Sequence, residues 1–286
     1  MKEQKDKKNF LYRDCLMDKR LEIMYDEYKN NVMLSRCCYT YPFISLSIKE
    51  FLKLDDIIKF SCGDFNHKIK NEVCACPCEI KPEIKVVTVG LSRACNLYCY
   101  HCFFKEHKDT PEMKELYFHT LERIKGHHLD VIHMQSSGEI FYYYHHLKCY
   151  LNSLTTKDTL QVNFQTNGNL LSAERLKELK EISKKTGIQY TFSFSMDAIT
   201  SETYKKVRCG GDFDKLLDIL ERTIILFGKE NIDLSFTIKE PNMHEASKFR
   251  KFYRDEYGIT RAYLSYDFFD KKCQDLYNSL PQEGIC

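Results

Sequence analysis

Hydrophobic and polar positions follow two alternating rhythms from about Lys85 onward. Short apolar runs typical of strands are separated by segments in which apolar residues recur every three or four positions, as on one face of a helix. The strand-like runs cover residues 84–91, 131–135, 160–166, 190–196, 233–238 and 261–266. Alternation at this spacing predicts parallel strands joined by right-handed helical crossovers.

Capping signals mark the ends of the predicted helices, which cover residues 110–126, 172–187, 214–227 and 242–258. Thr110 followed by a proline is typical of a helix start, and Ser172 precedes a helix that Gly187 ends. Asn242 with Glu245 three residues later resembles a capping box. About six β/α units form either a partial barrel or a doubly wound open sheet, and the pattern alone leaves both open.

The first 80 residues differ in kind from the rest. The run from Leu16 to Leu34 has the apolar spacing of a helix, and Ser47 with Glu50 forms a capping box before another apolar stretch. We therefore expect three parts: a mainly helical, cysteine-containing region (residues 1–80), an α/β core (81–270) and a short C-terminal tail (271–286).

Composition narrows the class of protein. The chain has 286 residues, 43% of them hydrophobic, which is enough for a sizeable core. With 43 basic and 41 acidic residues, the net charge of +2 gives no sign of a nucleic-acid partner. No apolar signal core follows the lysine-rich start, and no segment is long and apolar enough to cross a bilayer. We expect a soluble, cytoplasmic protein with no membrane partner, whose 14 cysteines are metal ligands and reduced thiols.

Three of these cysteines, Cys95, Cys99 and Cys102, lie in the string ACNLYCYHCFF directly after the first strand-like run. Thiolates are soft ligands that suit iron–sulfur clusters and zinc. Three cysteines leave one iron of a [4Fe–4S] cluster without a protein ligand, so a small molecule can bind there. The alternatives are a zinc knuckle or three unrelated core thiols.

Polar segments also follow the next strand-like runs. They are Ser137-Gly138-Glu139, Thr166-Asn167-Gly168, Ser195-Met196-Asp197 and the run from Val207 to Phe213 that contains Arg208. Because the carboxyl ends of parallel strands lie at one edge of a sheet, these segments are expected near the cysteine loop. Each is unspecific alone: a Gly-Glu pair is more often a plain turn, and a surface salt bridge is as good an explanation of Arg208.

Taken in order, the cysteine triplet and these segments resemble the radical S-adenosylmethionine (radical SAM) superfamily over about two-thirds of the chain. The resemblance implies a partial (β/α)6 barrel, a [4Fe–4S] cluster on Cys95, Cys99 and Cys102, and SAM bound to the open iron. The reduced cluster would split SAM into methionine and a 5′-deoxyadenosyl radical that abstracts hydrogen from a substrate. Its electron donor would be a flavodoxin, a ferredoxin or a chemical reductant.

The resemblance also implies the SAM contacts. Ser137, Gly138 and Glu139 would hold the amino group, and Arg208 would pair with the carboxylate as a bidentate fork. The other implied contacts are His101, whose backbone faces the adenine, Thr166 and Asn167, near the ribose and methionine, and Ser195, on the ribose or carboxylate. This chain departs from the family where His101 replaces an aromatic residue, Ser137 replaces a glycine and Ile140 replaces a common proline.

A second cysteine group precedes the core: Cys62, Cys74, Cys76 and Cys78. Four thiolates in this window can hold a second iron–sulfur cluster or a structural zinc. The alternative is a cysteine-rich segment without a metal, because C-x-C-x-C is not a common spacing for either.

The run from the fourth strand through Phe213 is similar to the radical SAM branch that modifies peptides and proteins, which favours a peptide or protein substrate slightly. The short tail lacks that branch's cysteine-rich extension, so a sugar or other small metabolite is the alternative. A non-catalytic zinc or iron–sulfur binding module is the alternative from another class. The sequence identifies no catalytic side chain beyond the cofactor ligands.

Overall fold

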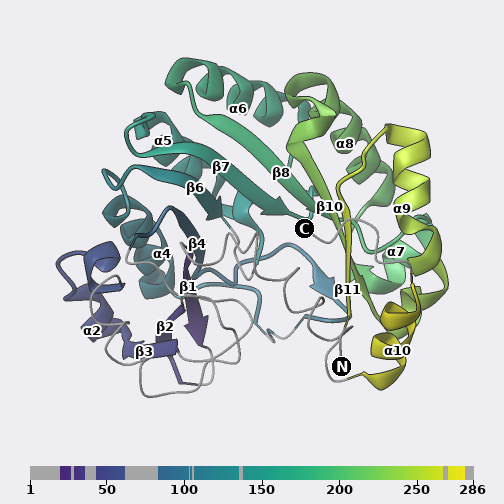
Figure 1. The fold of residues 1–286 in the computed structure, drawn as a ribbon, viewed down its shortest axis with the longest axis horizontal. Coiled ribbons are helices and arrows are strands. Elements are labelled where there is room, and N and C mark those ends of the chain that lie inside the picture. Colours follow the sequence, from purple (N-terminus) through teal and green to yellow (C-terminus); the bar gives the residue numbers. More distant parts are fainter. Residues whose placement is uncertain are drawn as a thin grey trace, which may run out of the picture.

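The computed structural model describes residues 20–26, 29–35, 43–61, 83–102, 104, 106–134, 138–266 and 270–280. One large sheet and the helices that cover it make up most of this part (Figure 1). The strands of this sheet are β1 (Arg20–Asp26), β2 (Asn31–Ser35), β3 (Phe43–Ser47), β4 (Val86–Gly90), β6 (Leu129–Met134), β7 (Thr159–Thr166), β8 (Gln189–Ser195), β10 (Ile232–Ile238) and β11 (Ala262–Tyr266).

The strand order is β11-β10-β8-β7-β6-β4-β1-β2-β3. The six strands from β4 to β11 are parallel and follow one another in chain order. A doubly wound sheet reverses this order at a switch point, whereas winding in one direction curves the sheet toward a barrel. Among the described residues, β3 and β11 are the two edges of the sheet and do not pair with each other. The predicted partial barrel is therefore confirmed.

Helices follow the strands and lie on the outer, convex side of the arch in Figure 1. They are α4 (Pro111–Arg123), α5 (Tyr144–Ser153), α6 (Ala173–Thr186), α7 (Ser201–Val207), α8 (Phe213–Phe227), α9 (Met243–Tyr257) and α10 (Lys271–Ser279), with short 3₁₀ turns at Ile140–Tyr143, Lys229–Asn231 and Glu240–Asn242. The predicted caps hold at two helices: Thr110 accepts from the backbone of α4 and Ser172 from that of α6, which Gly187 ends with a φ of 74°. None of the described helices is both long and apolar enough to span a lipid bilayer.

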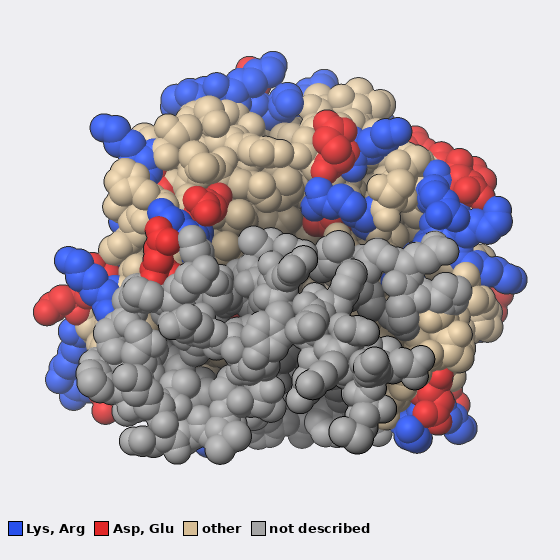
Figure 2. All heavy atoms as spheres, viewed as in Figure 1, with Lys and Arg blue, Asp and Glu red and all other residues tan. Residues whose placement is uncertain are grey.

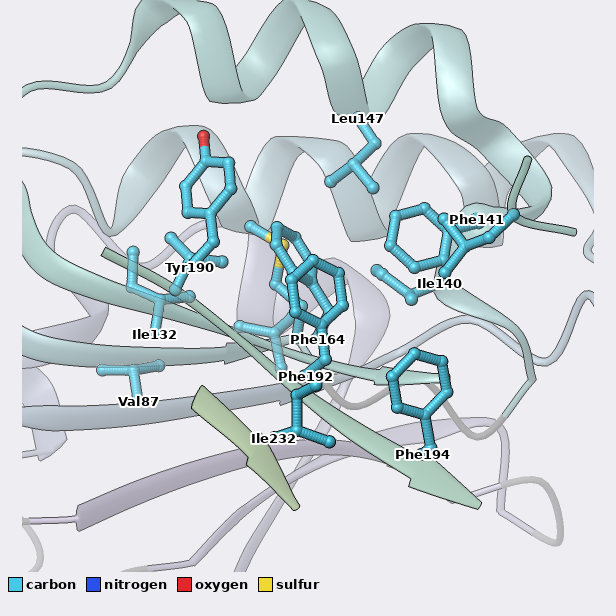
Figure 3. Packing of buried hydrophobic residues seen from close by; sticks show 14 of the residues in the cluster. Val87, Ile132, Ile140, Phe141, Leu147, Phe164, Tyr190, Phe192, Phe194 and Ile232 are labelled. Carbon is cyan, nitrogen blue, oxygen red and sulfur yellow. The ribbon is translucent and has the colours of Figure 1, made fainter. Parts of the chain in front are cut away.

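The hydrophobic core lies between the sheet and the helices. Phe164 on β7 and Phe192 on β8 point toward the helices, where Leu147 of α5 and Phe141 meet them (Figure 3). Burying one such side chain contributes about 1.5–3 kcal/mol. The outer surface of the helices mixes charges, and Figure 2 shows Lys and Arg as well as Asp and Glu along the rim of the face that it displays.

The opposite, concave face of the sheet is polar. On β7, Asn163 and Gln165 alternate with the core residues, and on β8 Ser193 and Ser195 alternate with Phe192 and Phe194. Strands of a parallel sheet buried on both faces read as continuous hydrophobic runs. The alternation observed here leaves the inside of the arch lined by hydrogen-bonding groups.

The helix predicted between Leu16 and Leu34 is wrong for the described residues 20–26 and 29–34. Strands β1 and β2 form an antiparallel hairpin instead, followed by β3, and β1 extends the sheet by pairing in parallel with β4. Leu21, Ile23, Val32 and Leu34 are buried with a period of two. Short apolar runs such as these fit the spacing of a helix as well as that of a strand. The segment forms a strand because the edge of β4 offers it backbone hydrogen bonds.

The mainly helical character expected of the N-terminal region is likewise corrected for its described residues, which hold three strands, the short helix α2 (Ile48–Leu52) and a second short helical segment at residues 57–61. The capping box of Ser47 and Glu50 does start that helix, as predicted. The predicted domain boundary near residue 80 lies outside the described residues, and the strands before it share one sheet with those after it.

Candidate active site

A cavity of about 230 Å³ lies at the carboxyl ends of the parallel strands. Its walls include ten of the residues singled out in the sequence: Cys95, Cys99, His101, Cys102, Gly138, Glu139, Thr166, Asn167, Ser195 and Arg208. The sequence analysis did not assign the other wall residues to the site: Leu97, Phe104, His107, Gln165, Ser235 and Thr237. Ser137 and the second cysteine group, Cys62, Cys74, Cys76 and Cys78, lie outside the described residues.

Backbone hydrogen bonds hold the cysteine loop over the end of β4. The N–H of Cys95 donates to the carbonyl of His107 at 3.1 Å, and that of Cys102 donates to the carbonyl of Cys99 at 3.0 Å. Cys99 belongs to a two-residue strand, β5 (Tyr98–Cys99), which pairs antiparallel with β9 (Arg208–Cys209). In this register Cys99 lies opposite Arg208, so the pairing brings two distant sequence motifs together.

The three half-buried thiols of Cys95, Cys99 and Cys102 are free and line the same cavity. Burial raises the pKa of Cys95 to about 11 and also raises that of Cys99, where the charge of Arg208 opposes the rise. N–H groups point at the sulfurs: that of Leu97 lies 3.4 Å from Cys95, and Nη1 of Arg208 lies 3.4 Å from Cys99. Donors of this kind stabilise metal-bound thiolates.

Within the described residues, no three His, Cys, Asp or Glu side chains are arranged to hold a single metal ion. A [4Fe–4S] cluster does not require that arrangement, because its cysteines bind different iron atoms. Three thiols on one short loop, facing one cavity and met by N–H donors, fit a cluster with one iron left without a protein ligand.

Glu139 is a buried carboxylate at the wall of the cavity, only 2% exposed. Its Oε1 accepts from Thr166 Oγ1 at 2.7 Å and from the N–H of Phe141 at 3.2 Å, and its Oε2 accepts from the N–H of Asn167 at 2.7 Å. Burial raises the pKa of Glu139, and these hydrogen bonds oppose the rise. A carboxylate oxygen accepts two hydrogen bonds, so Oε2 can take a further donor from a ligand.

Gly138 lets this segment pack against the cysteine loop. Its N–H donates to Ser92 and the N–H of Glu139 donates to the carbonyl of Ala94. A Cβ atom on Gly138 would lie 2.2 Å from that carbonyl oxygen, which is backbone and cannot rotate away.

Gly138→Ala is therefore expected to lower the free energy of unfolding by about 1–3 kcal/mol, the usual effect of overpacking. Equilibrium unfolding in urea measures the change. Gly126→Ala measures the strain of a positive φ alone, because nothing lies within 4 Å of its added Cβ. A Gly138→Ala variant as stable as the wild type would contradict close packing at Gly138.

Arg208 forms a buried ion pair with Asp197. Its Nε lies 2.6 Å from Oδ2 of Asp197, and its Nη2 contacts the same oxygen. The side chains are 12% and 0% exposed, which excludes the surface salt bridge that the sequence had left open. Burial alone lowers the pKa of Arg208, but the charges of Asp197 and Cys99 outweigh burial and raise it. The fork of Arg208 thus lies on Asp197, and Nη1 lies on Cys99.

Asp197 is held from several directions in a left-handed backbone conformation, with a φ of 53°. Its Oδ1 accepts from the N–H of Thr237 at 2.6 Å, and its carbonyl accepts from Nδ2 of Asn242 at 3.0 Å. Asn242 makes no side-chain cap to α9, so the predicted capping box is wrong. Its partner Glu245 accepts instead from the N–H of Ile199 at 2.6 Å. Both residues fix the loop that carries Asp197.

The remaining predicted residues lie around these groups. Nε2 of His101 lies 3.8 Å from Oδ2 of Asp197, and Nδ2 of Asn167 donates to Asn96 at 3.0 Å. Two wall residues that the sequence analysis missed, Ser235 and Thr237, occupy the polar positions of β10 between buried Leu, Phe and Ile residues. That alternation is the signal that would have identified them.

Comparison with known proteins gives one family match. The model of the Radical SAM superfamily matches residues 89–253, which is more than half of the chain and includes the walls of the cavity. The comparison with curated proteins gave no match.

Three solved structures are similar to part of the chain. The FeFe-hydrogenase maturase HydG from Carboxydothermus hydrogenoformans is 18% identical over 63% of this chain and 44% of its own, with a TM-score of 0.44. A second HydG structure is 13% identical over 63% of this chain and 42% of its own, with a TM-score of 0.41. Methylornithine synthase (PylB) is 15% identical over 57% and 50%, with a TM-score of 0.36. The chain thus spans half or less of each of these proteins.

Proposed function

Because the chain belongs to the radical SAM superfamily, a family of enzymes that use a [4Fe–4S] cluster and SAM, we propose that it abstracts hydrogen from a substrate by way of SAM cleavage. The observation that carries this proposal is the single cavity shared by the three thiols of the cysteine loop, Glu139 and Arg208. A cluster held by Cys95, Cys99 and Cys102 would supply one iron open to SAM and the electron needed to cleave SAM to methionine and a 5′-deoxyadenosyl radical.

Cys95, Cys99 and Cys102 are the proposed cluster ligands. The guanidinium of Arg208 places positive charge beside Cys99 and favours its thiolate form. The N–H of Leu97 acts in the same direction on Cys95. These residues prepare two of the three sulfurs to bind a metal cluster.

Glu139 is the proposed acceptor for the amino group of SAM. Its Oε2 keeps an unused acceptor position at the cavity wall, and its other hydrogen bonds hold the carboxylate still. Gly138 contributes through its backbone. The carbonyl and amide groups around His101, Thr166, Asn167 and Ser195 are proposed to contact the rest of the cofactor, because they line the same cavity. Arg208 already uses Nε and Nη2 to bind Asp197. We propose that the N–H groups of its Nη atoms that do not bind Asp197 face the carboxylate of SAM.

Other parts of the proposal rest on the sequence. The electron donor is a flavodoxin, a ferredoxin or a chemical reductant, and residues 81–270 are the catalytic core. Two substrate classes remain open: a peptide or protein, and a sugar or other small metabolite. A second cluster on Cys62, Cys74, Cys76 and Cys78 and a cytoplasmic location stay predictions from the sequence.

Electron paramagnetic resonance of the anaerobically reconstituted, dithionite-reduced protein tests the proposal. We expect the signal of a reduced [4Fe–4S] cluster, and we expect SAM to shift it because SAM binds the open iron directly. The reduced protein without SAM serves as the control, because it gives the signal of the cluster with its open iron unoccupied by SAM. Zinc in place of iron, or a cluster signal indifferent to SAM, would contradict the proposed function.

A further inference from the structure

A second cavity of about 230 Å³ lies on the polar concave face of the sheet. Its walls come from four neighbouring parallel strands and from β11, and all of its wall residues except one leucine carry a hydrogen-bonding group. They are His133, Asn163, Gln165, Ser193, Asp233, Leu234, Ser235 and Tyr263. Barrel interiors of this kind are ordinarily packed with branched apolar side chains, whereas this polar lining surrounds a space that can take a hydrogen-bonding solute.

The second cavity adjoins the first. Gln165 on β7 and Ser235 on β10 line both of them. A molecule in the second cavity therefore lies next to the cavity that holds the cysteine loop, Glu139 and Arg208. Reaction between two bound molecules requires this kind of adjacency.

The described walls of the second cavity carry no unpaired charge. Burial lowers the pKa of His133 to about 4, with the charge of Arg20 acting in the same direction, so His133 is neutral at physiological pH. The carboxylate of Asp233 is paired with Arg261, whose Nε and Nη2 lie 2.5 and 2.7 Å from its two oxygens. An ionic substrate would find no counter-charge among these residues, and burying an unpaired charge is strongly unfavourable.

Hydrogen-bonding capacity is nevertheless high. Within the described part of the chain, the Gln165 side chain makes no hydrogen bond, which leaves two donors and one acceptor at the junction of the cavities. Asn163 is fixed in place, because its Nδ2 donates to Thr191 at 2.9 Å and to Ser193 at 3.2 Å. The lining therefore combines a rigid polar wall with one free amide.

We propose that the second cavity binds the substrate, a small neutral molecule with several hydroxyl or amide groups, and that Gln165 positions it against the first cavity. This inference rests on the function proposed above. Leu234 is the one apolar residue among the described wall residues, so a peptide side chain finds little to pack against, and the lining suits a molecule such as a monosaccharide better than a peptide segment. Of the two substrate classes left open by the sequence, the cavity favours the small metabolite.

Equilibrium binding to the reconstituted protein in the presence of SAM tests the inference, with glucose, galactose, mannose, ribose and myo-inositol as neutral probes. Their charged counterparts are glucuronate, glucosamine and glucose 6-phosphate, and an octapeptide of neutral residues completes the set. We expect at least one neutral probe to bind at least tenfold more tightly than every charged counterpart and than the peptide. Tighter binding of a charged probe or of the peptide, or no binding of any neutral probe, would overturn the inference.

Two variants locate the binding. Gln165→Leu keeps the size of the side chain and removes its amide, and it is expected to weaken binding of the neutral probe about tenfold. Ser193→Ala is a smaller change that is expected to act in the same direction if Gln165→Leu fails to fold. Asn152→Leu on α5 is the matched control, because among the described residues the Asn152 side chain bonds to Lys148 and Lys185 on the outer helices and lines neither cavity. Unchanged probe affinity in both cavity variants would overturn the inference.

SAM cleavage by the wild-type protein separates the two proposals. Cleavage to 5′-deoxyadenosine without binding of neutral probes contradicts the substrate class and leaves the proposed function standing. Binding of a neutral probe without any cleavage contradicts the proposed function.

Discussion

Asp197→Asn is expected to lower the free energy of unfolding by about 3–5 kcal/mol, the usual effect of breaking a buried ion pair by removing one partner. Asp197 is fully buried, and Arg208 keeps its positive charge at every accessible pH. Asparagine retains the shape of the side chain and tolerates a φ of 53°, so the change removes charge without adding backbone strain. Its amide N–H would face either the guanidinium of Arg208 or the N–H of Thr237, and one donor would lose its acceptor.

Urea unfolding at equilibrium measures this effect. Asp218→Asn is the matched control, because Asp218 pairs with Arg222 on the exposed surface of α8, where ion pairs contribute little. We expect the control to unfold at the same urea concentration as the wild type. If both variants unfold alike, the Asp197–Arg208 pair does not hold the site together.

Replacing Cys95, Cys99 and Cys102 together by alanine is expected to remove about four iron atoms per chain from the reconstituted protein. The same variant should lose all SAM-dependent chemistry, because no other described thiols line the cavity. Removing one N–H group that donates to a sulfur would only weaken binding of the cluster. Removing all three thiolates leaves the cluster without a protein ligand on this loop.

Iron and sulfide content after anaerobic reconstitution measure the change. Cys149→Ala is the control, because Cys149 is exposed on α5 and lies outside the cavity. It should keep the iron content of the wild type. Full iron content in the triple variant would contradict the assignment of the cluster to this loop.

The sequence predicted the parts of the fold that depend on local rules. Ser172 and Gly187 bound α6 because capping is decided within a few residues. The gathering of Cys95, Glu139, Thr166 and Arg208 on one cavity was predictable as well, since consecutive parallel strands bring their carboxyl ends to one edge.

Nonlocal choices were not predictable. The segment of β1 and β2 fits a helix by spacing, but the two strands form a hairpin because the edge of β4, far along the chain, accepts β1. The partner of Arg208 could not be inferred, because Asp197 reaches it only through the turn that Asn242 and Glu245 hold. Polar and apolar residues alternate along β7, β8 and β10, which indicates that one face of the sheet is polar. Alternation alone does not show that this polar face lines a cavity.

Formation of 5′-deoxyadenosine is the most direct test of the central claim, that the cavity at the strand ends performs SAM-based radical chemistry. The reconstituted wild-type protein is reduced under anaerobic conditions, mixed with SAM and analysed by liquid chromatography beside the Cys95, Cys99 and Cys102 triple alanine variant. The account predicts 5′-deoxyadenosine from the wild type and none from the variant. Equal amounts from both, or none from a wild-type protein that holds its full cluster, would contradict it.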